Sequence, residues 1–172
     1  DNTQLFTSLI NDMLEVSQLD NTSAELPRKL LDISKIIRAE MEHLPVKEGV
    51  EYRLELAAPE IVFPLHRSYV SLLVRELLKN AVKFTEQGSV TVKCGLTGSD
   101  TLTLSVTDTG CGVEPGLAEK IFDRFYKVDP FAQGLGLGLS LCRLIVEKLG
   151  GTIALDTSYT GGARFVVTLR DA

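Results

Sequence analysis

The first residues of this chain that could do chemistry are a carboxylate, an amide and a cation on one predicted helix: Glu76, Asn80 and Lys83. At about 100° per residue, these three side chains share an arc of about 60° beside an apolar stripe. An amide oxygen suits Mg²⁺, which takes few protein ligands when phosphates supply the rest. Lys83 would then place a point charge near a phosphate. The alternative is a solvated helix edge with Glu76 and Lys83 as charge neighbours.

A second group, Asp108-Thr-Gly110-Cys-Gly112, follows a predicted strand. Alone, this pattern is typical of a turn. Taken together with the other three groups, the pattern makes Asp108 the expected reader of adenine: a buried carboxylate can accept a hydrogen bond from the exocyclic amine of adenine, whereas guanine would present a carbonyl oxygen there and be repelled. Gly110 and Gly112 would let the backbone approach a flat base without an intervening Cβ.

A third group, Gly134, Leu135, Gly136, Leu137 and Gly138, runs directly into a predicted helix. Glycines before a helix N-terminus expose free amides and the positive end of the helix dipole, which suit phosphates. The pattern is no Rossmann signature, because no strand closely precedes it, and no Walker A loop, because no Lys-Ser/Thr follows.

A fourth group, Phe122-Asp-Arg-Phe125-Tyr-Lys127, lies between the second and third. We expect its aromatic side chains to fasten a lid to the domain more than to contact a ligand. Arg124 and Lys127 are candidates for contacting phosphates, and the alternative is that they are solvated charges of the lid.

In their order and spacing along the chain, the four groups at residues 76–83, 108–112, 122–127 and 134–138 resemble the N, G1, F and G2 boxes, respectively, of the ATP-binding domain of sensor histidine kinases, in the GHKL ATPase superfamily. The resemblance covers about residues 25 to 170. It implies ATP and Mg²⁺ as cofactors, with Asn80 on the metal, Lys83 on a phosphate, and Glu76 as a polariser or base or as a structural partner of the metal shell. The implied nucleotide contacts are Asn80, Lys83, Asp108, Gly110, Gly112, Phe122, Phe125, Lys127, Gly134, Leu135, Gly136, Leu137 and Gly138.

Two features depart from the family pattern. The family usually carries Thr or a similar small residue at the place of Leu135, so a hydroxyl contact is lost there while backbone contacts remain. The stretch from Lys127 to Gln133 is short for a family lid, so we expect a lid that moves less than most.

The elements that must position these residues mix helices with largely antiparallel strands. We therefore expect an α+β fold, a two-layer α/β sandwich in which helices cover a mixed sheet; the resemblance names it the Bergerat ATP-binding fold. Residues 25–172 would form this catalytic and ATP-binding domain. Expected helices span 32–43, 69–85 and 137–149, and expected strands span 25–30, 51–56, 61–65, 89–96, 102–108, 152–156 and 163–169.

Residues 3–20 also read as a helix, since Phe6, Leu9, Met13 and Val16 recur at spacings of 3, 4 and 3. Such a helix packs in an ordinary core or in a helix bundle. The resemblance implies that residues 1–24 end the second helix of a dimerisation hairpin. Because the chain opens inside this helix without Met, we expect a fragment of a longer protein.

Bulk composition narrows the class. A chain of 172 residues with 44% hydrophobic residues can bury a real core. The net charge of −5 disfavours binding to nucleic acid. Three irregularly spaced cysteines suggest reduced, cytosolic residues. No apolar run approaches the roughly 20 residues of a membrane helix, so we expect no membrane contact by this fragment and a cytoplasmic location, with a parent that could be membrane-anchored.

The resemblance also implies a phosphoacceptor histidine, and neither His43 nor His66 has the context of one. We expect the acceptor upstream of Asp1, and this fragment to bind ATP without phosphorylating itself. Expected partners are the parent's dimerisation and phosphoacceptor domain and the receiver domain of a response regulator. The parent would be a homodimer and the fragment a monomer.

Two other functions stay open. An ATP-driven conformational machine of the gyrase, chaperone or mismatch-repair type is favoured by Glu76, because hydrolytic relatives use a Glu there to activate water. A pseudokinase that binds nucleotide and signals by conformation is opposed by Asn80, Asp108 and the intact glycine boxes.

Overall fold

The computed structural model describes residues 28–123, 126–127 and 138–171. The described chain begins with a small antiparallel sheet of β1 (Lys29–Asp32) and β3 (Val62–Leu65). Between them lie α2 (Ile33–Glu42) and β2 (Val50–Leu56). Asp32 caps α2, because its Oδ1 accepts the amide hydrogen of Ser34 at 3.1 Å.

The main sheet has five strands in the order β2-β4-β5-β7-β6. Among the strands that the structure describes, β2 and β4 are the one parallel pair, so the sheet is mixed as predicted. The strands added here are β4 (Gly88–Thr97), β5 (Thr101–Asp108), β6 (Thr152–Leu155) and β7 (Ala163–Arg170). Two 3-10 turns, η1 (Pro115–Leu117) and η2 (Lys120–Phe122), follow β5.

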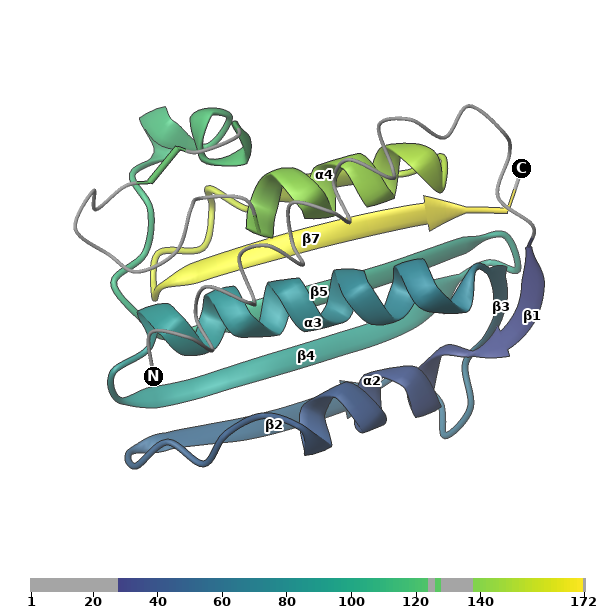
Figure 1. Ribbon diagram of the computed structural model, residues 1–172, viewed down its shortest axis with the longest axis horizontal. Coiled ribbons are helices and arrows are strands. Elements are labelled where there is room, and N and C mark those ends of the chain that lie inside the picture. Colours follow the sequence, from purple (N-terminus) through teal and green to yellow (C-terminus); the bar gives the residue numbers. More distant parts are fainter. Residues whose placement is uncertain (1–27, 124–125, 128–137, 172) are drawn as a thin grey trace, which may run out of the picture.

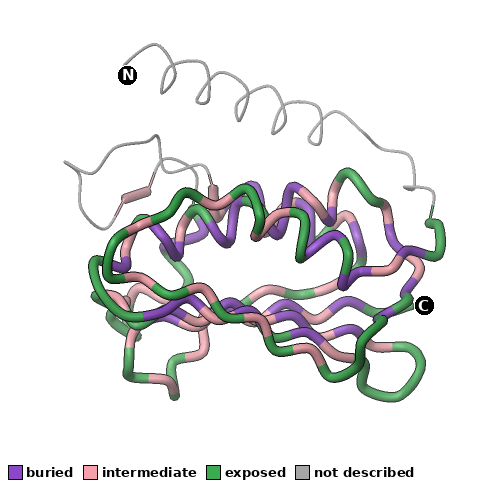
Figure 2. Tube along the Cα trace, turned by 90° about the horizontal axis from the view of Figure 1, so that it is seen from below, coloured by how far each residue is buried: buried purple, intermediate pink, exposed green. Residues whose placement is uncertain are grey.

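Helices α2, α3 (Arg67–Phe84) and α4 (Gly138–Lys148) lie on one face of this sheet (Figures 1 and 2). The two-layer α+β architecture expected from the sequence is therefore confirmed. Strand β5 shows why the layers adhere, since every second residue from Leu102 to Asp108 is buried while those between are half-exposed. The core between the layers includes Ile33, Ile37, Leu73, Leu77, Leu78, Val90, Val92, Leu104, Leu141, Ile145 and Val167.

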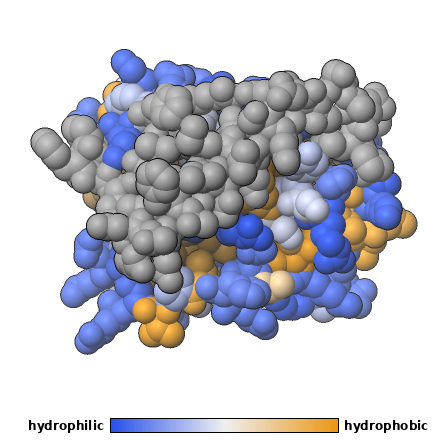
Figure 3. Space-filling model, in the orientation of Figure 1, coloured by the Kyte–Doolittle hydropathy of each residue, from blue (hydrophilic) through white to orange (hydrophobic). Residues whose placement is uncertain are grey.

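On the face seen in Figure 3, outside the grey atoms, hydrophilic residues occupy most of the periphery, with hydrophobic residues showing between them. No helix of the described residues has both the length and the hydropathy that crossing a bilayer requires. Most predicted elements lie within a few residues of the observed ones.

The first strand is the main difference, because it continues to Asp32 instead of ending at Leu30. Leu31 and Asp32 pair with Phe63 and Val62 of β3, and this long-range pairing extends the strand. The expected N-terminal helix, Phe125 and the residues from Gly134 to Leu137 lie outside the described residues.

Candidate active site

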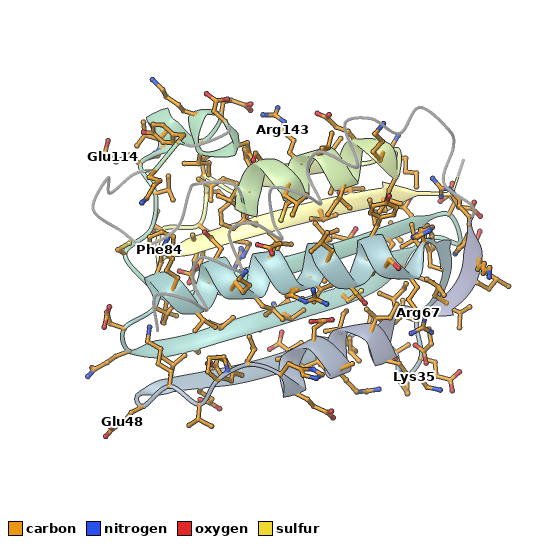
Figure 4. The ribbon with its side chains drawn as sticks, viewed as in Figure 1. Lys35, Glu48, Arg67, Phe84, Glu114 and Arg143 are labelled. Carbon is orange, nitrogen blue, oxygen red and sulfur yellow. The ribbon has the colours of Figure 1, made fainter. Side chains whose placement is uncertain are left out.

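Three chain segments meet at one end of the helical layer: the C-terminal half of α3, the loop after β5 and the first residue of α4. A Cβ added to Gly110 would lie 2.1 Å from the carbonyl oxygen of Phe84, the last residue of α3. A Cβ added to Gly138 would lie 3.2 Å from Oε2 of Glu76. Figure 4 shows Phe84 and Glu114, which follows the β5 loop, at this same end of the molecule.

The predicted polar edge of α3 is graded from buried to exposed. Glu76 is only 4% exposed, Asn80 is half-buried and Lys83 is exposed. Lys79 donates to Oε1 of Glu76 at 3.4 Å, and the ammonium of Lys83 lies 5.3 Å from the ring centre of Phe84. The solvated-edge alternative is therefore wrong for Glu76, whose carboxylate lies inside the protein.

The neighbour that buries Glu76 is α4. Cys142 of α4 is completely buried, and its thiol pKa is raised well above the usual range, first by burial and second by the negative charge of Glu76. Together with the approach of Oε2 to Gly138, this places the Glu76 carboxylate beside the N-terminal turn of α4. A negative charge is favoured there by the helix dipole.

Asp108, at the end of β5, is 2% exposed, so the buried carboxylate expected from the sequence is present. Its Oδ1 accepts the amide hydrogens of Gly110 at 2.9 Å and of Ala163 at 3.2 Å. Burial raises the pKa of Asp108, and the two amide hydrogen bonds oppose that rise. Both hydrogen bonds reach one oxygen, so the second oxygen is the atom suited to a ligand.

The structure gives a reason, not evident from the sequence, why the two residues after Asp108 at positions 110 and 112 are glycines. We expected Gly110 and Gly112 to clear space for a base. In the fold, the space beside Gly110 is filled by the Phe84 carbonyl. Gly112 has a φ of +73°, and a Cβ there would lie 3.0 Å from the carbonyl oxygen of Gly162. The protein's own backbone therefore makes both glycines necessary.

The loop between β6 and β7 is a part of this site that the sequence reasoning missed. Gly162 has a φ of +154°, and a Cβ there would lie 2.1 Å from the Asp108 carbonyl oxygen. The next residue, Ala163, supplies the amide that holds Oδ1 of Asp108. The pair Gly161-Gly162 was the available signal, since adjacent glycines mark a close backbone approach or an unusual turn.

Phe122, from the group at residues 122–127, packs into the domain. It is 4% exposed, its ring meets Phe165 of β7 edge-on at 6.0 Å, and the Arg143 guanidinium lies 5.4 Å from its centre. This agrees with the expectation that aromatic residues fasten this segment to the domain. Lys127 is half-exposed, and Arg124 lies outside the described residues.

The donor set fits a metal that brings phosphate ligands with it. Within the described ranges, no cluster of three or more His, Cys, Asp or Glu residues could enclose a metal ion. Asn80 instead offers one half-buried amide oxygen, one helical turn beyond the buried Glu76 carboxylate. Mg²⁺ commonly takes one or two protein oxygens and completes its shell with phosphates and water.

Comparison with known proteins agrees with this geometry. The family model of histidine kinase-, DNA gyrase B- and HSP90-like ATPases matches residues 66–172, and the chain belongs to that family. The chain is 34% identical over 169 residues to sensor protein IrlS of Burkholderia pseudomallei (strain K96243), covering 91% of this chain and 35% of that protein. It is 32% identical over 143 residues to sensor histidine kinase MtrB of Mycolicibacterium paratuberculosis (strain ATCC BAA-968 / K-10), covering 79% and 25%.

Solved structures share the fold. Full-length ShkA in complex with AMPPNP matches with a TM-score of 0.84 and 28% identity, over 94% of this chain and 35% of that one. Histidine kinase ThkA, solved with response regulator protein TrrA, matches with a TM-score of 0.81 and 20% identity, over 99% of this chain and 49% of that one. This chain spans about a third or less of the curated relatives described above.

Proposed function

We propose that this chain is the ATP-binding catalytic domain of a sensor histidine kinase, which transfers the γ-phosphoryl group of ATP to a histidine outside residues 1–172. The observation that carries the proposal is the buried Glu76 carboxylate beside the start of α4, in a chain of this ATPase family. Asn80 follows Glu76 by one turn of α3, and the loop after Asp108 packs against the end of the same helix. A base, a metal and a phosphate group would each find a matching partner within this one region.

Asp108 would recognise adenine. Its carboxylate is fixed by two backbone amides and shielded from solvent, so it would discriminate strongly between the amine of adenine and the carbonyl of guanine. A buried charged acceptor left facing a carbonyl oxygen loses its hydrogen bond and stays desolvated.

Asn80 would hold Mg²⁺ on the triphosphate, and Lys83 would contact a phosphate. The exposed Lys83 lies one turn beyond Asn80, toward the Gly110 loop. Backbone amides from Gly134 to Gly138 and the side chain of Lys127 would complete the phosphate contacts. Mg²⁺ bound there would neutralise charge that develops during phosphoryl transfer.

Glu76 would act as a polariser or base toward the incoming histidine. Its buried position beside the N-terminus of α4 suits a role in proton transfer or charge stabilisation. The same carboxylate is also the observation that favours the second candidate, an ATP-hydrolysing conformational machine, in which it would activate water.

The acceptor histidine would be presented by a separate helical hairpin, with residues 1–24 as its end. His43 caps the end of α2, and its Nδ1 lies 2.6 Å from the Ala39 carbonyl oxygen. His66 is the N-cap residue directly before α3, and its ring lies 4.6 Å from that of Tyr69. Both histidines thus lie at helix ends. The phosphoryl group would pass on to a response-regulator receiver domain; ATP chemistry and these partners suit a cytoplasmic domain.

A labelling experiment tests this proposal. Incubated with γ-labelled ATP and Mg²⁺, the chain alone should gain no acid-labile phosphate. Mixed with the acceptor hairpin of a histidine kinase, it should label that hairpin slowly, because tethering normally supplies a millimolar effective concentration. Release of inorganic phosphate without labelling would favour the ATPase machine instead. Labelling of His43 or His66, located by mass spectrometry, would contradict the acceptor argument.

A further inference from the structure

The loop from Asp156 to Gly162 and the start of β7 also hold the main chain of Asp108, through residues that have no role in the function proposed above. The Tyr159 hydroxyl donates to the main-chain carbonyl oxygen of Asp108 at 3.2 Å. This hydrogen bond joins residues 51 positions apart in the sequence. It acts on the backbone of the same residue whose side chain is held by Ala163.

The Tyr159 ring is itself positioned by Arg164. The guanidinium carbon of Arg164 lies 4.3 Å from the ring centre, a cation–π contact. Arg164 also donates from Nε to Oγ1 of Thr107 at 3.1 Å and pairs with Oδ2 of Asp156 at 3.4 Å. Thr107 directly precedes Asp108 on β5, so one arginine side chain connects the strand to the loop.

Hydrogen bonds to Asp156 stabilise the start of this loop. Its Oδ1 accepts hydrogen bonds from the Ser158 hydroxyl at 2.6 Å and the Ser158 amide at 3.0 Å. The amide of Tyr159 donates to the Asp156 carbonyl at 3.2 Å. Asp156 therefore fixes both the turn that carries Tyr159 and the guanidinium that lies on its ring.

We infer that Tyr159 and Arg164 are positioning residues that set the base specificity of this site, by holding Asp108 in place at its main chain. The inference rests on the adenine-binding role proposed for Asp108. The network reaches Asp108 through its carbonyl oxygen and through Thr107, so it leaves the second carboxylate oxygen of Asp108 to the ligand. A carboxylate whose backbone can shift would present its oxygen to adenine less accurately and would repel a guanine carbonyl less.

The experiment removes the Tyr159 hydroxyl and measures competition of ATP and GTP against a fluorescent ATP analogue. Tyr159→Phe should weaken ATP binding by about 3- to 10-fold, the equivalent of one hydrogen bond. The affinity for GTP should stay the same or increase. The ratio of ATP affinity to GTP affinity should therefore fall by at least the same factor of about 3 to 10. A role in fold stability alone would weaken both nucleotides equally and leave their ratio unchanged.

Two further variants complete the design. Tyr52→Phe is the matched control, because the Tyr52 hydroxyl also donates to a main-chain carbonyl, that of Pro45 at 2.6 Å, away from the site. It should leave the ATP-to-GTP ratio unchanged. Arg164→Lys keeps a cation for the Tyr159 ring and removes the Nε donor to Thr107, so it should narrow the ratio less than Arg164→Met does.

The possible results distinguish a failure of this inference from a failure of the proposed function. If the wild-type chain prefers ATP and Tyr159→Phe leaves the ratio unchanged, or alters it no more than Tyr52→Phe does, the positioning role is wrong and the proposed function stands. If Tyr159→Phe fails to fold, the comparison of Arg164→Lys with Arg164→Met decides. A wild-type chain that binds neither nucleotide would overturn both.

Discussion

The carboxylate of Glu76 on α3 faces Gly138, the first residue of α4, so closely that a methyl group on Gly138 would lie 3.2 Å from Oε2. Gly138, one of the proposed phosphate-binding glycines, therefore begins α4 directly beside Glu76, the proposed polariser. A shift of α4 at its N-terminus would change the surroundings of Glu76 directly.

Glu76→Gln should slow phosphoryl transfer while leaving the affinity for ATP nearly unchanged. The amide keeps the volume of the side chain, so ATP affinity should change by less than about threefold. Transfer to an acceptor hairpin should fall by about 10²- to 10⁴-fold, the usual contribution of a general acid–base group. Parallel calorimetry and single-turnover labelling measure the two quantities. Unchanged transfer would leave Glu76 with a structural role.

Asp108→Asn should weaken nucleotide binding while the fold stays intact. The variant replaces the charged acceptor with a group that can turn a donor toward the adenine amine. A hydrogen bond to a charged group contributes about 1.5–3 kcal/mol, so ATP and adenosine should each bind roughly 10- to 150-fold more weakly. Wild-type affinity in calorimetric titration would contradict the adenine assignment.

The ligand-free chain should show a distinct pH dependence from Asp108. Burial raises the pKa of its carboxyl above 3.8, so the folded state binds this proton more tightly than the unfolded state. The free energy of unfolding should therefore fall as pH rises from about 3.8 through the raised pKa. Denaturant titrations should show this slope for the wild type relative to Asp108→Asn. Parallel pH profiles for the two proteins would contradict it.

Asn80→Ala should reduce Mg²⁺-dependent ATP affinity more than adenosine affinity. In the proposed function, Asn80 acts through the metal on the phosphates and Asp108 acts on the base, so Asn80→Ala should spare the affinity for adenosine. Titrations of ATP with and without Mg²⁺, compared with adenosine, measure the difference. Equal losses for both ligands would mean that Asn80 serves the structure of α3 alone.

Gly162→Ala should destabilise the domain, because the new Cβ would lie 2.1 Å from the Asp108 carbonyl oxygen at a φ of +154°. Backbone strain of this kind costs about 1–3 kcal/mol, which lowers the Tm of a domain this size by about 2–12 °C. Gly116→Ala is the matched control, since a Cβ there has nothing within 4 Å. Equal Tm values for the two variants would contradict the close packing of this loop on Asp108.

The sequence by itself determined most of the elements and the chemical types in the site. Hydrophobic period alone located α3, and alternation located β5 with Asp108 at its buried end. Both patterns are local, because they record which side of an element faces the core. Local patterns therefore suffice to predict a strand, a helix and the burial of a residue that continues the alternation.

Only the tertiary structure decided what each residue faces. Helical spacing placed Glu76 beside Asn80 and Lys83, yet the neighbour that buries Glu76 is α4, from a distant part of the chain. Likewise Tyr159 reaches Asp108 across 51 residues, and Gly162 approaches it only after β5 and β7 have paired. Periodicity fixes directions within one element. The partners in those directions depend on how separate elements pack, and that packing is a property of the whole fold.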